Sequence, residues 1–365
     1  MKFNCKKEDL QAVLSLAHSI VNPKSTLSIL SNVLIETEGP HDLYITATDL
    51  EIGAKCLVKA EVIDQGSVTL PAKKFFDVVK GFPIRDLTIE ISENNVASLT
   101  SESTLVKILG LPKDEFPKFP EVSMDRAITI GQAVFKKMLQ RTVYAISEDS
   151  TRYVLTGLYM SFKDGNMHAV ATDGKRLSVV KKEISIPEGM EEAIIVPAKT
   201  VNEVMRSLKE EGDVLISIVG NHVAFKVSNI LIVSRLIEGH FPDYGQVIPE
   251  KTDEKIIINR EELLSAISRA SIFTDEKSNS VKIKVSKNKL TLSSNIAEVG
   301  ESKEEIDLTY EGKEILVAFN PSYLIDVLKT IENEEVTLEL SNSESPGVIR
   351  TNETFTYVIM PMRMA

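Results

Sequence analysis

Apolar residues recur at helical spacing in six stretches of the chain. In the first stretch Leu10, Val13, Leu14 and Ala17 fall on one face, because residues three and four positions apart are neighbours on a helix. The stretches form three pairs, and each pair begins about 125 residues after the previous one. The predicted helices are Lys6–Ile20, Ala72–Gly81, Gln132–Ile146, Ala198–Lys209, Arg260–Ala270 and Pro321–Glu332.

Alternating apolar and polar residues between these helices predict antiparallel strands with one solvent-exposed face. The alternation is clear in Leu43–Thr48 and in Val281–Val285. Lys163-Asp164-Gly165-Asn166 has the composition of a tight hairpin turn. The other predicted strands are Thr88–Ile91, Ser98–Leu109, Gly157–Phe162, Val214–Ile218, Ile230–Leu236, Leu290–Ser293 and Thr337–Leu340.

Short sequence landmarks repeat together with the helices. Ala47–Leu50 recurs as Ala171–Gly174, and Leu111–Pro117 recurs as Leu236–Pro242, 125 residues later. Landmarks that keep one order and nearly one spacing indicate duplication. We therefore predict an α+β fold of three repeated domains, each with two helices on one side of an antiparallel sheet. The predicted domains are residues 1–122, 123–250 and 251–365.

Composition favours a folded protein of the cytoplasm. The chain has 365 residues, 43% of them hydrophobic, which is enough for more than one buried core. It has no apolar run of membrane-spanning length, and charged residues follow Met1 where a secretory signal would be apolar. Cys5 and Cys56 have no CxxC spacing, which suits a reducing compartment. We expect a soluble cytoplasmic protein with no membrane partner.

Charge is distributed unevenly along the chain. The net charge is −11, yet the six predicted helices together carry +6, so the strands and connections carry −17. A basic surface on an acidic body suits a polyanion held through its phosphates without base readout. The alternative is that lysine is simply a good, soluble residue on the outer face of amphipathic helices. Charge alone nominates Lys136, Lys137, Arg141, Arg206 and Lys209 for contact with such a polyanion.

No motif in the sequence predicts catalysis. The five histidines have no metal-ligand spacing, and P-loop and GxSxG motifs are absent. Asp49 and Asp173 occupy equivalent positions of two repeats, so we expect them to lie far apart and to hydrogen-bond turns. We predict a non-enzyme without metal or cofactor.

The full length of the sequence resembles the sliding clamp of bacterial replication, the beta subunit of DNA polymerase III. The resemblance rests on Pro71–Phe76 (PAKKFF), Ala171–Leu177 (ATDGKRL), Phe241–Tyr244 (FPDY) and Met360–Arg363 (MPMR), among other motifs. It implies the DNA-clamp architecture, in which two chains join head to tail as a homodimer and close a six-domain ring with helices lining the hole. Such a ring encircles duplex DNA, slides, and tethers the polymerase as its processivity factor. The alternative is a duplicated protein-binding scaffold that does not encircle DNA.

The resemblance also implies partners and site residues. The expected partners are duplex DNA without sequence preference, the clamp loader complex, the DNA polymerase III alpha subunit and other proteins with a clamp-binding motif. The residues expected near DNA are Lys24, Lys73, Lys74, Arg152, Tyr153 and Lys199.

A pocket between the second and third domains is implied for partner peptides containing apolar and glutamine residues. Its methionines suit varied partners, because methionine repacks easily. Lys175 stands where the family has histidine, Gln246 stands where arginine is common, and Ala365 extends the tail; the first two leave peptide preference open. The implied pocket residues are Leu155, Thr172, Gly174, Lys175, Arg176, Leu177, Pro242, Val247, Asn320, Tyr323, Val358, Met360, Pro361, Met362 and Arg363.

The implied dimer seam joins the first domain of one chain to the third domain of the next. Val106 and Ile108 alternate with Lys107 as in an edge strand, which invites pairing with another chain. Ile272 and Phe273, at the end of a predicted helix, are expected on the other side.

Overall fold

The computed structural model describes residues 1–22, 27–83, 86–102, 104–274, 279–352 and 354–363, so Lys24 and Ala365 lie outside the described residues. All six predicted helices are confirmed. They are α1 Lys7–Ile20, α2 Ala72–Gly81, α3 Gln132–Gln140, α4 Ala198–Ser207, α5 Arg260–Ala270 and α6 Pro321–Thr330. Helix α3 ends six residues before its predicted end, because the Thr142 hydroxyl donates to the carbonyls of Met138 and Leu139 and the chain turns there.

The chain folds into two compact units, each assembled from separate segments. The first contains Met1–Lys136, Pro187–Met190 and Lys199–Leu236, and the second contains Lys137–Ile186, Glu191–Ala198 and Ile237–Ala365. None of the helices in the described part of the chain is long and apolar enough to span a membrane.

The first unit is built on one twelve-stranded antiparallel sheet. Its main path runs β8-β7-β6-β1-β4-β16-β15-β14-β9, with β2, β3 and β5 branching from β4. The pairing of β4 with β16 sets Cys56 opposite Ile230, so strands from the first two repeats share one sheet. The strands are β1 Lys2–Lys6, β2 Asn32–Glu38, β3 Asp42–Thr48, β4 Ile52–Asp64, β5 Ser67–Pro71, β6 Asp86–Ile91, β7 Val96–Ser101, β8 Thr104–Leu109, β9 Ile128–Gly131, β14 Asp213–Val219, β15 His222–Val227 and β16 Ile230–Arg235.

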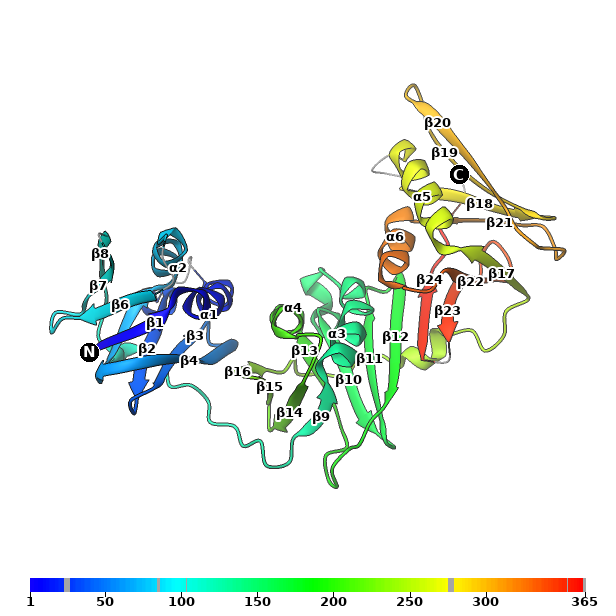
Figure 1. Cartoon of the computed structure of the whole chain (residues 1–365). Coiled ribbons are helices and arrows are strands. Elements are labelled where there is room, and N and C mark those ends of the chain that lie inside the picture. The colour runs from blue at the N-terminus through cyan, green and yellow to red at the C-terminus, as the bar shows by residue number, and fades with distance from the viewer. Residues whose placement is uncertain (23–26, 84–85, 103, 275–278, 353, 364–365) are drawn as a thin grey trace. The chain divides into compact units, whose positions relative to one another are not determined.

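Helices α1 and α2 lie side by side on one face of this sheet, as Figure 1 shows. Leu10, Val13, Leu14 and Ala17 are all buried there, as the apolar periodicity predicts. Each fully buried aliphatic side chain of this kind contributes roughly 1.5–3 kcal/mol to folding.

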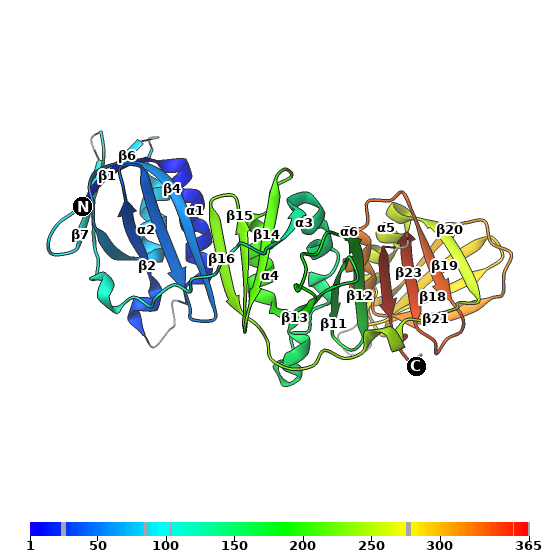
Figure 2. The same ribbon diagram turned by 90° about the horizontal axis from the view of Figure 1, so that it is seen from below.

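The second unit contains two antiparallel sheets. An eight-stranded sheet runs β13-β10-β11-β12-β24-β23-β22-β17, and a four-stranded sheet runs β20-β19-β18-β21. Strand β12 pairs with β24, which sets Leu177 opposite Val358 and joins the second repeat to the third (Figure 2). The strands are β10 Gly157–Lys163, β11 Asn166–Thr172, β12 Arg176–Glu183, β13 Glu192–Pro197, β17 Glu254–Asn259, β18 Val281–Ser286, β19 Lys289–Ile296, β20 Gly300–Asp307, β21 Ile315–Phe319, β22 Glu335–Leu340, β23 Gly347–Asn352 and β24 Phe355–Ile359.

The predicted fold class of paired helices on antiparallel sheets is confirmed, but the prediction of one strand is wrong. The stretch Ser98–Leu109 was predicted as a single strand, but it is the hairpin β7–β8. Glu102 at its turn has φ of 44°, a conformation that alternation of apolar residues does not reveal. The hairpin predicted at Lys163–Asn166 is confirmed, with φ of 50° at Asp164 and 69° at Gly165.

Candidate partner-binding, DNA-facing and dimerisation surfaces

A loop closed by its own hydrogen bonds joins β11 to β12. Asp173 Oδ1 accepts hydrogen bonds from the backbone of Lys175 at 2.8 Å and of Arg176 at 3.0 Å. The Thr172 hydroxyl accepts from Gly174 N and donates to the Arg176 carbonyl at 2.6 Å. Gly174 has φ of 84°, where residues with a side chain are strained. The equivalent Asp49 accepts from Glu51 N and Ile52 N, so the predicted turn role of both aspartates is confirmed.

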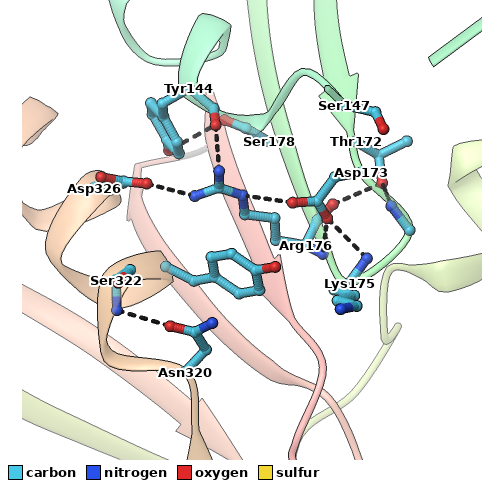
Figure 3. Close-up of polar contacts among 12 residues, drawn as sticks. Tyr144, Ser147, Thr172, Asp173, Lys175, Arg176, Ser178, Asn320, Ser322 and Asp326 are labelled. Atoms are coloured by element: carbon cyan, nitrogen blue, oxygen red, sulfur yellow. Dashed lines mark hydrogen bonds and ion pairs between the residues drawn. The ribbon is translucent and has the colours of Figure 1, made fainter. Parts of the chain in front are cut away.

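Arg176 connects this loop to helix α6. Its guanidinium donates to Asp326 Oδ2 at 2.6 Å, to Asp173 Oδ2 at 3.0 Å and to the Tyr144 carbonyl (Figure 3). It also lies 4.3 Å from the centroid of the Tyr323 ring, in cation–π contact. Only 10% of the Arg176 side chain is exposed, and its contacts hold the planar guanidinium, here named the Arg176 fork, in one orientation.

The electrostatics of this cluster keep Arg176 charged and its tyrosines neutral. Burial opposes the charge, but the hydrogen bond to Asp326 and the charges around it hold the pKa of Arg176 above its ordinary value. Burial raises the pKa of Tyr144, of Tyr323 and of Tyr357. The Tyr357 hydroxyl donates to the Tyr323 carbonyl at 2.9 Å. The cluster therefore provides a fixed polar framework and no group poised for proton transfer near neutral pH.

The C-terminal tail is anchored beside the same loop. Met360 N donates to the Lys175 carbonyl at 2.9 Å, and Met362 N donates to the Ala318 carbonyl of β21 at 2.8 Å. Met360 is 43% exposed. Because the tail is held by its backbone, the Met360 side chain remains exposed.

Not every residue predicted for the pocket is open to solvent. Leu155, Leu177 and Val358 are buried, and the last two belong to an apolar cluster with valines of β11, β12 and β23. Asn320 caps α6 by accepting from Ser322 N at 2.9 Å. Gly174, Lys175, Pro242, Val247, Met360 and Arg363 are exposed, whereas Thr172, Arg176, Tyr323, Pro361 and Met362 are half-buried.

Sequence reasoning missed the residues that hold Arg176 in place. Asp326 and Tyr144 contact it directly, and Tyr357 supports Tyr323. Asp326 follows Tyr323 by three positions on α6, a spacing that places both on one helix face and was available in the sequence.

The cations predicted to face DNA in the first unit fall into two groups. Lys73, Lys74 and Lys209 are exposed. The others form ion pairs, Lys136 with Glu210 at 2.7 Å, Lys199 with Asp49 at 2.7 Å and Arg206 with Glu203 at 2.8 Å. The Lys199 ammonium also donates to the Ile20 carbonyl at the end of α1.

The predicted cations of the second unit are also in contact with other side chains. Lys137 pairs with Glu332 at 2.8 Å, and Arg152 pairs with Asp149 at 3.0 Å. The Arg141 guanidinium lies 5.5 Å from the centroid of the Phe355 ring, and Tyr153 is 56% exposed. Exposed ion pairs of this kind contribute at most about 1 kcal/mol to stability.

Exposed apolar residues lie on one sheet edge and in the turn that follows α5. Strand β8 ends the twelve-stranded sheet, and Leu105 and Leu109 on it are 57% and 75% exposed, whereas Ile108, predicted at the dimer seam, is only 7% exposed. Val106 is half-buried. Strand β20 ends the four-stranded sheet. Ile272, in the single turn Ser271–Phe273 that follows α5, is 70% exposed, and Phe273 is half-buried.

A search of the described residues for three or more histidine, cysteine, aspartate or glutamate side chains able to share a metal ion finds no such group. The buried thiols of Cys5 and Cys56 are both free, and burial raises the pKa of each to about 12.

Comparison with known proteins identifies the family. Models of the DNA polymerase III beta subunit match in order, the N-terminal domain over residues 1–120, the central domain over 129–243 and the C-terminal domain over 245–363. The beta sliding clamp of Chlamydia pneumoniae is 34% identical over 364 residues, covering 100% of this chain and 99% of that protein.

Solved structures agree with these matches. The DNA polymerase sliding clamp from Bacillus subtilis is 30% identical and has a TM-score of 0.94, with 100% of both chains covered. The DNA polymerase III subunit beta from Pseudomonas aeruginosa, solved bound to griselimycin, is 32% identical with a TM-score of 0.94, again over 100% of both chains. The resemblance seen in the sequence is confirmed, and the chain belongs to the family of DNA polymerase III beta subunits, the beta sliding clamps.

Proposed function

We propose that the chain acts as a ring of two copies around duplex DNA and holds its partners at the surface around Arg176. Family membership gives the underlying function, which is that of a sliding clamp, a non-catalytic processivity factor for DNA polymerase. The observation that carries the ring proposal is that three repeats of two helices on an antiparallel sheet fill the whole chain.

We propose that the basic helix residues contact DNA phosphates. Lys73, Lys74 and Lys209 are exposed, and the ion pairs of Lys136 and Lys137 involve exposed carboxylates and are weak enough to exchange with phosphate. The Arg206 side chain is 66% exposed, although its partner Glu203 is buried, and we propose that it contacts phosphate with its exposed part. Weak, sequence-independent contacts suit a ring that slides. The same role is proposed for Arg141, Arg152, Tyr153 and Lys199, and for Lys24, which lies outside the described residues.

We propose that the dimer forms by pairing of β8 with β20 of a second copy. Both strands end their sheets in the described part of the chain, and an edge strand adds readily to another sheet. Strand β20 has four carboxylates and one lysine, whereas Lys107 is the single charge on β8. The exposed Leu105, Leu109 and Ile272 would be covered in this pairing, together with Val106 and Phe273, while Ile108 supports β8 from its own sheet.

We propose that partner peptides with apolar and glutamine residues bind between the Asp173 loop, helix α6 and the C-terminal tail. The fixed Arg176 fork and the exposed Met360 and Val247 support this. The proposed partners are the clamp loader complex, the DNA polymerase III alpha subunit and other proteins with a clamp-binding motif. The proposed pocket comprises the fifteen residues from Leu155 to Arg363 named above, of which the buried Leu155, Leu177 and Val358 support the lining from beneath.

Division of the chain into domains at residues 1–122, 123–250 and 251–365 is proposed as well, and the three consecutive family matches support a division into three. A clamp that serves the bacterial replicative polymerase would work in the cytoplasm.

Topology separates this function from that of a protein-binding scaffold. The chain, loaded by its clamp loader on nicked circular duplex DNA, should remain bound through gel filtration and should dissociate once the circle is cut. A scaffold that does not encircle DNA would show equal retention on circular and linear DNA, and that result would overturn the ring proposal.

A further inference from the structure

A segment of residues 241–252, here named the strap, crosses one face of the eight-stranded sheet. Directly opposed residues on antiparallel strands share a face, and Leu177, Val358, Val348 and Glu339 are opposed in turn across β12, β24, β23 and β22. Val170, Leu177, Val179, Val348 and Val358 form the apolar cluster on this face, and Phe241, Tyr244 and Ile248 of the strap pack against it.

Polar contacts hold the C-terminal end of the strap. The Thr252 hydroxyl donates to Glu339 Oε2 at 2.9 Å, and Arg350 donates to the Pro249 carbonyl at 3.2 Å and to Glu339 at 2.9 Å. The Glu339 side chain is only 3% exposed. A buried carboxylate with several partners is costly to separate, so this end of the strap is firmly attached.

The N-terminal end of the strap is held by rings and one hydrogen bond. The Phe241 ring stacks on Tyr159 with centroids 4.9 Å apart. The Tyr244 hydroxyl and His168 Nδ1 lie 2.9 Å apart, the single polar contact that joins Tyr244 to the sheet among those found in the described residues. Pro242 and Val247, which we place in the peptide pocket, flank Tyr244 on this part of the strap.

The surroundings of His168 disfavour its charged form. Ser161 of β10 and Lys181 of β12 are its direct cross-strand neighbours, and Tyr159 lies on the same face of β10. From the strap, the Tyr244 hydroxyl faces His168. The carboxylate of the neighbouring residue Asp243 accepts hydrogen bonds from Gly245 N at 3.1 Å and from the Gln246 side chain at 3.0 Å. Asn166 precedes His168 by two residues on β11. Its cross-strand neighbours are Lys163 of β10 and Glu183 of β12, which are the next charged residues along the same face of the sheet from His168.

We propose that His168 and Tyr244 form a latch that positions the strap, and that protonation of His168 loosens the strap and weakens binding of partner peptides. This inference rests on the proposed function, because it assumes that Pro242 and Val247 touch the peptide. His168 is a positioning residue in this account and does not itself touch the peptide.

The direction of the pH effect follows from linkage. Burial, and then the charge of Lys181, lowers the pKa of His168 while the strap covers it. A histidine exposed by a lifted strap has a pKa of about 6.5. The latched state therefore binds fewer protons than the state with the strap lifted. The free-energy difference that favours the latched state is fully present above about pH 6.5 and is lost progressively as the pH falls below that value.

The test measures binding of a fluorescent pentapeptide, Gln-Leu-Ala-Leu-Phe, to the full-length protein at about pH 8 and about pH 5.5, on either side of the histidine pKa. We expect the wild-type affinity to fall about twofold or more at the lower pH. His168→Gln keeps an oxygen that can accept from Tyr244 but cannot be protonated, so it should bind tightly at both values. Tyr244→Phe should bind about two- to tenfold more weakly at both values, because it removes one hydrogen bond.

The control is His222→Gln, on β15 of the first unit, which should keep the wild-type pH dependence. Far-UV circular dichroism at each pH shows that every variant is folded. A wild-type pH dependence that persists in His168→Gln overturns the latch and leaves the pocket intact. Absence of peptide binding to the wild type at either pH refutes the pocket and the latch together, so the two failures are distinguishable.

Discussion

At the scale of single residues, the equivalent aspartates Asp49 and Asp173 show how a duplicated position acquires different tasks. Each uses one carboxylate oxygen to close its own turn. The second oxygen of Asp49 binds Lys199, and that of Asp173 binds Arg176. The turn role was predictable from the Asp-containing motif, whereas the cation partner was not, because it depends on which strand or helix packs beside the turn.

Arg176→Ala should destabilise the second unit. The substitution leaves Asp173 and Asp326 without their cation and the Tyr144 carbonyl without a donor, which we expect to cost about 2–4 kcal/mol of unfolding free energy. Urea unfolding followed by circular dichroism measures the change. The exposed Arg126 supplies the control, since Arg126→Ala should stay within about 0.5 kcal/mol of the wild type. Equal unfolding midpoints for the two variants would show that the Arg176 fork adds nothing.

Cys5 and Cys56 should resist alkylation in the folded protein. Burial raises the pKa of both thiols to about 12, so neither the reactive thiolate nor access to reagent is available. Mass spectrometry after iodoacetamide treatment near neutral pH should find no label on either residue, whereas the urea-unfolded chain should take up two labels. Labelling of the native protein would contradict the burial of these side chains.

At the scale of elements, the sequence specified helices better than strand pairing. Six helix windows matched because apolar spacing and the buried face agree, as in Leu10–Ala17 and Leu263–Ile267. The hairpin β7–β8 was missed because its turn depends on backbone conformation at Glu102. The strap was missed because residues 241–252 have no periodicity of either kind and are fixed by tertiary contacts with Tyr159, His168 and Glu339.

Lys107→Glu combined with Leu109→Asp should yield monomers. Both substitutions add negative charge to β8, where the proposed partner strand β20 already has an acidic excess, and like charges across paired strands are destabilising. Sedimentation velocity gives the mass in solution. Ile63→Asp is the matched control, because Ile63 is an equally apolar, 53% exposed residue near the end of β4. A double variant that sediments as a dimer would exclude this seam.

At the scale of the whole molecule, the repeats and the sheets follow different boundaries. The region matched by the central family model, residues 129–243, places β9 and β14–β16 in the twelve-stranded sheet and β10–β13 in the eight-stranded sheet. The three repeats could be predicted from spacing, since landmarks such as Pro71 and Pro197 recur in the sequence. The sheets that continue across them could not, because no local pattern shows which edge strand of one repeat pairs with which strand of the next.

Lys136→Glu with Lys137→Glu and Arg141→Glu should weaken retention on circular DNA while leaving the dimer intact. Each reversal removes one interaction with a phosphate, so the slope of log affinity against log salt concentration should become shallower by about 0.9 for each substitution. Retention measured at several salt concentrations tests this. The triple reversal Lys182→Glu, Lys226→Glu and Lys313→Glu changes the net charge equally at exposed positions away from these helices. If both triple variants release DNA to the same extent, net charge alone explains the effect.

The pairings of β4 with β16 and of β12 with β24 have a consequence for how the protein can be divided. A fragment cut at the repeat boundaries would lose β4 and β24. The central repeat would then have two unpaired edge strands, β16 and β12, each of which could pair with the same strand of another copy. Such a fragment should precipitate or form fibrous aggregates, whereas one trimmed to include the neighbouring strand at each margin would stay dispersed.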